Sequence, residues 1–184
     1  GCNLRNVHVT TGSTCEISGA DVSEGKGDWN VWVSRRSRLV ADGMVCSNGL
    51  GGGMAVLRSD VSFVPFSAED AYISNNATDN INVNDASTLF MGSRSGRKVV
   101  SSGAGRDNLI VGGSSTVEAE GADLSGAGRN GIKVDGAGRV NAPSCNLSGS
   151  ANFALEASRG ATVNAENSDC TGYGISGIKC IRGA

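Results

Sequence analysis

The sequence predicts an all-β protein, a single-stranded right-handed parallel β-helix with three short strands in each turn of about 23 residues. The first observation is a repeat, because apolar segments beginning at Leu109, Ile132, Leu155 and Ile178 follow one another every 23 residues. The second is that apolar and polar residues alternate in these segments, as in half-buried strands. The third is a composition of 28 glycines, 2 prolines and 4% aromatic residues. Together they indicate a solenoid, in which each unit buries its apolar side against the next.

The first strand of each turn begins at one residue of an apolar series. Counting back from the regular part of the chain, the expected starts are Val7, Val31, Ala55, Ile81, Leu109, Ile132, Leu155 and Ile178. These side chains are expected to face inward as one wall of the core, and the residue after each to face outward. Seven full turns and the start of an eighth would make a rod about 35 Å long, at about 4.8 Å per turn.

A second strand is expected eight residues after each start. Its inward residues would be Cys15, Leu39, Phe63, Leu89, Val117, Val140 and Val163. Third segments follow near residues 20–22, 44–46, 71–73 and 99–101, and later at Leu124, Leu147 and Cys170. The unequal turns and the lack of a six-residue sub-period favour a right-handed over a left-handed β-helix. The corners are rich in glycine and serine, and Ser-Gly-Ala-Gly-Arg occurs at both 102–106 and 125–129.

Two adjacent turns carry extra residues at the corner between their second and third strands. The insertions, residues 65–70 and 92–98, are expected to form one lobe that bears the charged residues Glu69, Asp70, Arg94, Arg97 and Lys98. Loops on a rigid scaffold commonly carry function, so the lobe is a candidate ligand-binding element. The alternative is a solvated pair of loops with weak ion pairing.

Charge and cysteine content limit the partners and cofactors. With 16 basic and 18 acidic residues, the net charge of −2 predicts no nucleic-acid partner. No apolar run approaches the length of a membrane span, so no membrane insertion is expected. The six cysteines include no C-x-x-C pair and there is one histidine, so we expect no metal site and no cofactor. Free, mostly inward thiols fit folding in a reducing compartment.

Outward residues are the candidates for binding. Trp32, Asn80, Asn82 and Asn84 are proposed to contact a glycan, because an indole stacks on sugars and amides hydrogen-bond to them. The alternative is that these asparagines serve the corners, where Asn tolerates the left-handed backbone.

Catalysis would need carboxylates gathered on one face. Acidic residues do occur near both outer faces: Asp79, Asp85, Asp107, Glu118, Glu120 and Asp123. No motif marks any of them as catalytic, so no catalytic residue is assigned.

On the second-strand face, Val40, Val64 and Phe90 are expected to form an apolar strip between Glu16 and Glu118. A contiguous apolar patch usually marks a contact surface, so this strip is predicted to be a subunit interface. Residues 1–184 are interpreted as one β-helix domain. Because neither end shows a capping layer, we expect the domain to be a segment of a larger assembly or to be capped by one.

The repeat with its Ser-Gly-Ala-Gly-Arg corners resembles the pectin-lyase-like β-helix superfamily, and in particular the β-helical segments of bacteriophage tailspikes and tail fibres. The resemblance implies a virion structural protein that folds in the host cytoplasm without disulfides and attaches to a host-surface polysaccharide. It also implies a homotrimer in which other virion subunits or domains cap both ends. The first alternative is a polysaccharide lyase or glycoside hydrolase, that is, a depolymerase of this fold. The second is a secreted adhesin.

Overall fold

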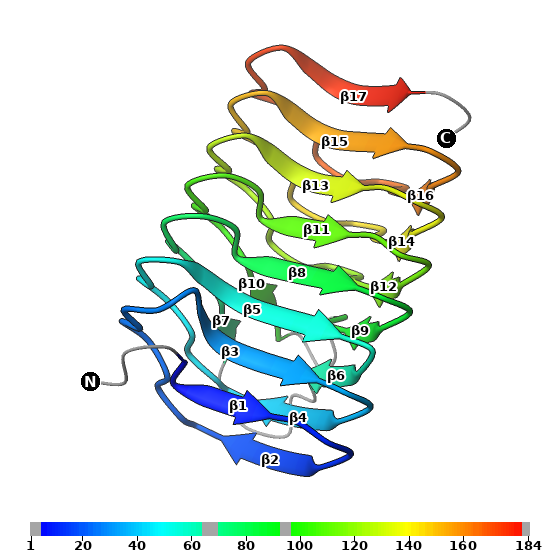
Figure 1. Ribbon diagram of the computed structural model, residues 1–184. Coiled ribbons are helices and arrows are strands. Elements are labelled where there is room, and N and C mark those ends of the chain that lie inside the picture. The colour runs from blue at the N-terminus through cyan, green and yellow to red at the C-terminus, as the bar shows by residue number, and fades with distance from the viewer. Residues whose placement is uncertain (1–4, 64–69, 93–96, 182–184) are drawn as a thin grey trace.

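The structure, a computed structural model, describes residues 5–63, 70–92 and 97–181. Within these residues the chain winds as a parallel β-helix of about seven turns, each stacked on the one before, so the β1 turn and β17 lie at opposite ends of a rod (Figure 1). The predicted fold class is therefore confirmed. No helix among the described residues could cross a membrane.

Three parallel sheets form the sides of the rod. Sheet A contains the first strand of every turn: β1 (Val7–Val9), β3 (Trp29–Ser34), β5 (Gly52–Leu57), β8 (Ile81–Asn84), β11 (Leu109–Val111), β13 (Asn130–Val134), β15 (Phe153–Ser158) and β17 (Ser176–Ile181). Sheet B contains the second strands: β2 (Thr14–Ser18), β4 (Arg38–Asp42), β6 (Asp60–Phe63), β9 (Thr88–Phe90), β12 (Thr116–Glu118), β14 (Arg139–Asn141) and β16 (Thr162–Asn164). The third side is shorter. There β7 (Ala71–Tyr72) pairs with β10 (Val99–Val100), and isolated bridges continue the ladder on both sides.

The register of sheet A matches the predicted wall except in one turn. Val31 pairs with Met54, and Met54 pairs with Ile81, so Met54 occupies the inward position that was assigned to Ala55. Val56, predicted to face outward, is fully buried between Val33 and Val83. The prediction was wrong here because residues 52–57 of this turn contain no polar residue, so alternation could not distinguish the two faces.

The same turn shifts the second strand. Val61, not Phe63, pairs with both Leu39 and Leu89. Phe63 still faces the core, with 2% of its surface exposed, but it pairs with Ala41. As a consequence Ser62 is the outward residue between Val40 and Phe90 on sheet B.

A row of buried asparagines runs inside the corner that precedes sheet A. The amide of Asn30 donates to Asn76, Asn76 donates to Asn80, and Asn80 donates to Asn108, over N···O distances of 2.9–3.3 Å. Asn76 comes from the corner itself and occupies the space beside Gly53, where a Cβ atom would lie 2.7 Å from its amide nitrogen. The row satisfies backbone groups that would otherwise be buried without partners.

The corner between sheets A and B uses serine in the same way. The backbone N–H groups of Ser37, Ser59 and Ser87 each donate to the hydroxyl of the serine one turn further along, at 3.1–3.2 Å, and the series ends at Ser115. Stacked turns thus repeat polar as well as apolar contacts, which fixes their register.

The repeated Ser-Gly-Ala-Gly-Arg corner is explained by its two glycines. The first, Gly103 or Gly126, has a φ of +66° or +67°, a left-handed conformation that favours glycine. The second, Gly105 or Gly128, lies against the turn below, where a Cβ atom would come within 2.1 or 2.2 Å of a carbonyl oxygen. Both positions therefore exclude larger residues.

The five cysteines in the described part of the chain are free. Burial raises the pKa of Cys46 to about 12 and that of Cys145 to about 11, which keeps both thiols protonated at neutral pH. Cys180, on β17, is exposed. Cys2 lies outside the described residues.

Candidate functional site

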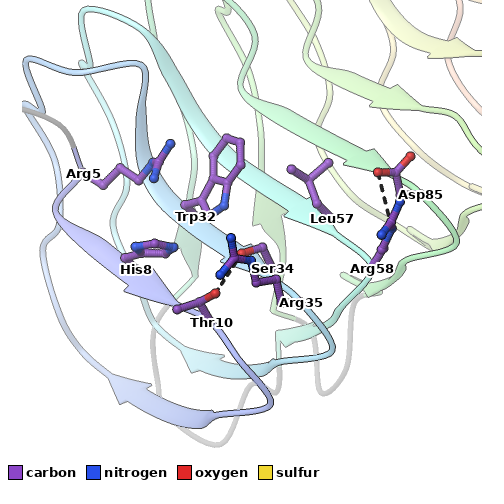
Figure 2. A pocket seen from close by; sticks show the side chains of 9 residues that line it. All are labelled: Arg5, His8, Thr10, Trp32, Ser34, Arg35, Leu57, Arg58 and Asp85. Atoms are coloured by element: carbon purple, nitrogen blue, oxygen red, sulfur yellow. Dashed lines mark hydrogen bonds and ion pairs between the residues drawn. The ribbon is translucent and has the colours of Figure 1, made fainter.

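A groove of about 380 Å³ lies on the outer face of sheet A, over β1, β3 and β5, and its lining also includes Arg5 before β1 and Asp85 after β8 (Figure 2). Its lining combines an indole, an aliphatic side chain, two hydroxyls and several charged groups: Arg5, His8, Thr10, Trp32, Ser34, Arg35, Leu57, Arg58 and Asp85. The strands supply the outward residues of three adjacent turns, and the corners supply the charged rim. A groove of this kind can hold a ligand that is apolar on one face and polar at its edge.

Trp32 forms the aromatic wall of the groove. It lies in register with His8 on one side and Ala55 on the other. The guanidinium carbon of Arg5 lies 4.1 Å from the centre of the Trp32 ring, a cation–π contact. Arg5 also pairs with Asp28, with N···O at 3.1 Å. These two contacts place the Arg5 guanidinium against the indole and beside Asp28.

The opposite side of the groove is polar. The hydroxyls of Thr10 and Ser34, on adjacent turns, lie 3.3 Å apart. Arg58 and Asp85 form a loose ion pair at 3.9 Å, and their side chains are 75% and 55% exposed. Figure 2 shows the Arg35 side chain beside Ser34 and the Arg58–Asp85 pair at the far side, past Leu57. The groove therefore offers an aromatic surface with hydrogen-bond donors and acceptors around it.

Arg35 and Arg58 follow their strands at the same corner and have positive φ angles of 60° and 51°. Thr11 and Ala137, elsewhere along the rod, also have positive φ. The left-handed backbone is therefore a property of this corner. The Arg36 N–H donates to the Arg58 carbonyl at 2.6 Å, which stacks the two corners on each other. Arg35 and Arg58 therefore project from consecutive turns.

Of the four predicted glycan contacts, Trp32 alone lines this groove. Asn80 is fully buried, and its amide donates to Ser102 and Asn108, so it belongs to the core row. Asn82 and Asn84 do face outward, and the Asn84 amide donates to the Asn82 side chain. Ala55 separates Asn82 from Trp32 in the ladder, so Asn82 lies two turns from the indole.

The predicted charged lobe is described only in part. Glu69 and Arg94 lie outside the described residues. Asp70 accepts a hydrogen bond from the backbone N–H of Lys98 at 2.9 Å, which joins the two insertions. Arg97, next to Lys98, is partly buried.

The predicted apolar strip on sheet B is interrupted. Val40 and Phe90 are half-buried outward residues with Ser62 between them, and Val64 lies outside the described residues. A second groove of about 400 Å³ lies over this region and includes Phe90, Ser62 and Arg38 in its lining.

Asp79 and Asp107, in the corners that precede β8 and β11, are both buried and do not form an open catalytic pair. Asp107 is fully buried, and its Oδ1 accepts hydrogen bonds from the backbone and amide of Asn130 at 3.1 and 2.7 Å. Burial raises the pKa of Asp107, and the nearby Arg129 opposes that shift. Asp79 is 6% exposed and accepts from the Asp107 N–H. In the described ranges no group of three His, Cys, Asp or Glu side chains is placed to hold a metal ion.

No protein-family model matches the chain, and no curated protein matches it. The fold alone defines the class to which the protein belongs, the parallel β-helices.

The sequence pattern places His8 and Trp32 on the outer face of the first strands, but it did not single out Arg5, Arg35 or Arg58 as part of a binding site. Arg35, Arg58 and Asp85 each lie four residues after an inward first-strand residue, namely Val31, Met54 and Ile81. That common offset is the signal that could have revealed the charged rim.

Proposed function

We propose that this chain is a glycan-binding β-helical module of the kind that bacteriophage tailspikes and tail fibres present to a host surface. The observation that carries the proposal is the groove beside Trp32. An indole already held by Arg5, with the paired hydroxyls of Thr10 and Ser34 nearby, suits a sugar that has one apolar face and hydroxyls at its edge. The parallel β-helix is compatible with this role, because it supplies a rigid surface that needs little ordering on binding.

The proposal includes the setting of the protein. We place the module in a virion, as a homotrimer whose ends contact other virion subunits or domains. Free thiols among the described cysteines support folding in a reducing cytoplasm. The half-buried Val40 and Phe90 on sheet B, the side of the rod that does not carry the Trp32 groove, remain the proposed subunit contact.

The alternative of a depolymerase finds little support in the geometry. Glycoside cleavage needs two carboxyl groups that a substrate can reach from both sides of the bond. Among the described residues, the Trp32 groove is lined by one carboxylate, Asp85, and the nearby corner residues Asp79 and Asp107 are almost completely buried. An assay for new reducing ends or unsaturated uronates on host capsule tests this alternative directly.

The test of the proposed function is a glycan array followed by calorimetry with the best ligand. Trp32→Ala is expected to weaken binding at least about tenfold, the effect typical of a buried aromatic anchor. Trp29→Ala is the matched control. Trp29 is on β3, as Trp32 is, but its ring lies over Gly52 of the next turn and does not line the groove. Circular dichroism should show that both variants keep the β-rich fold. Equal loss of binding in the two variants, or no binding to any glycan, would contradict the proposal.

A further inference from the structure

The charged rim of the Trp32 groove points to a class of ligand. We infer that the groove binds a sugar with an anionic substituent (a carboxylate, sulfate or phosphate), which Arg35 holds together with Arg58. This inference rests on the proposed glycan-binding function and specifies the ligand chemistry at that site.

The first argument is the local charge. The groove lining contains three arginines, Arg5, Arg35 and Arg58, and one carboxylate, Asp85. The protein as a whole is acidic, with a net charge of −2. Because Asp28 pairs with Arg5 and Asp85 with Arg58, the local excess among the described residues is one positive charge, that of Arg35, and it attracts anions to that groove.

The second argument is the availability of the arginines. Arg5 is held on the Trp32 ring and by Asp28. Arg35 is exposed, and no ion pair involving it occurs within the described residues. The Arg58–Asp85 pair is long and exposed, so it stabilises the protein little and can exchange Asp85 for a ligand anion.

The third argument is position. The Arg35 N–H donates to the Leu57 carbonyl at 3.2 Å, and the next residue bonds to Arg58, so Arg35 and Arg58 lie on adjacent turns. Adjacent turns are about 4.8 Å apart, a separation over which two guanidinium groups can reach one carboxylate or sulfate. Ser34 and Thr10 then lie where a neighbouring hydroxyl of the sugar could bond, and Trp32 and Leu57 supply the apolar contact.

The experiment compares charged and neutral forms of one ligand. Oligogalacturonate and its carboxyl-reduced form share one chain and linkage, and differ in that each carboxylate is replaced by a neutral hydroxymethyl group. A heparin oligosaccharide adds the sulfate class. Binding of each to the 184-residue chain is measured by calorimetry at low salt and at about 0.3 M NaCl. At least one anionic sugar is expected to bind about tenfold or more tightly than the neutral form and to weaken as salt rises.

Arg35→Gln is expected to weaken binding of that anionic sugar about tenfold, since a charge-assisted hydrogen bond is lost. Arg36→Gln is the control: it removes the same charge from the neighbouring exposed residue, which has a similar φ of 62° and does not line the groove. Its affinity should stay within about twofold of that of the unmodified chain.

The outcomes separate the two proposals. Equal loss in Arg35→Gln and Arg36→Gln would show general surface attraction and overturn the inference. Trp32-dependent binding of neutral sugars with no salt effect would overturn the inference and leave the glycan-binding function standing. Failure of every sugar to bind would overturn both.

Discussion

At the scale of single residues, Asp107 is an acidic side chain that the stacking of turns buries completely. Asp107 pairs through its carboxylate with Asn130 of the next turn, and its backbone N–H bonds to Asp79 of the turn before. Its second carboxylate oxygen is buried and has no partner among the described residues. Burial is the main reason that the pKa of Asp107 is raised.

This leads to a prediction about pH. Because the pKa of Asp107 is higher in the folded than in the unfolded chain, its contribution to the unfolding free energy falls as pH rises from the unfolded value of 3.8 through the raised folded value. Asp107→Asn removes that loss and keeps an oxygen that can accept from Asn130. The variant should gain stability relative to the unmodified chain at pH 7 and lose the advantage below pH 3.8, as measured by urea unfolding.

Asp60→Asn, at an exposed position on sheet B, is the control for removing one negative charge. The prediction is contradicted if, at pH 7, Asp107→Asn has a lower unfolding free energy than the unmodified chain and this deficit shrinks at low pH. The buried carboxylate would then stabilise the fold rather than destabilise it.

At the scale of elements, the corner before sheet A depends on its row of asparagines. Asn108 donates to the carbonyl oxygens of Leu124 and Ser125 at 2.6 and 2.7 Å and accepts from the Ala104 N–H at 3.0 Å. It also accepts from Asn80. One side chain therefore satisfies backbone groups on its own turn and on the next.

Asn108→Ala is expected to lower the unfolding free energy by about 3 kcal/mol or more, because several buried polar groups lose their partners at about 1–3 kcal/mol each. Asn82→Ala is the matched control, since Asn82 faces outward on the neighbouring strand and should cost less than about 1 kcal/mol. Urea unfolding followed by circular dichroism measures both. Similar losses in the two variants would contradict the role assigned to the row.

At the scale of the whole molecule, the rod presents two different outer faces. Sheet A carries the Trp32 groove at its N-terminal turns, and sheet B carries Val40 and Phe90 with Ser62 between them. Because the register of β6 places Ser62 between Val40 and Phe90, the apolar surface on sheet B is smaller than the sequence pattern predicted. An interface there would have to include neighbouring polar residues as well.

The prediction for assembly follows from that surface. If sheet B forms the contact between subunits of a homotrimer, the double variant Val40→Asp and Phe90→Asp should retain its circular dichroism spectrum and become monomeric by light scattering, since two charges would be buried at the interface. Ile110→Asp, at an outward position of sheet A, should leave the assembly unchanged. A double variant of unchanged mass would mean that the contact lies elsewhere.

The repeat by itself determined the fold and most of the core. From Leu109 to Ile178 the spacing is constant, and in the turns that begin at Ile132, Leu155 and Ile178 the inward first-strand residue is apolar and the next, outward one is charged. One register is therefore clearly favoured, and the structure has that register. Where this contrast disappears, between Gly52 and Leu57, only packing decided that Met54 rather than Ala55 enters the core. The larger side chain fills the interior, and the small one takes the place beside Trp32.

Tertiary structure also decided the binding surface. Asn80 is inside because the chain turns at the corner, so Asn80 and Ile81 are both buried and the alternation is broken there. Arg5, Arg35 and Arg58 are far apart in the sequence and share a groove only because their turns stack in register. Alternation along a strand reports which side a residue faces, whereas the residues that meet across turns depend on the length of every corner between them.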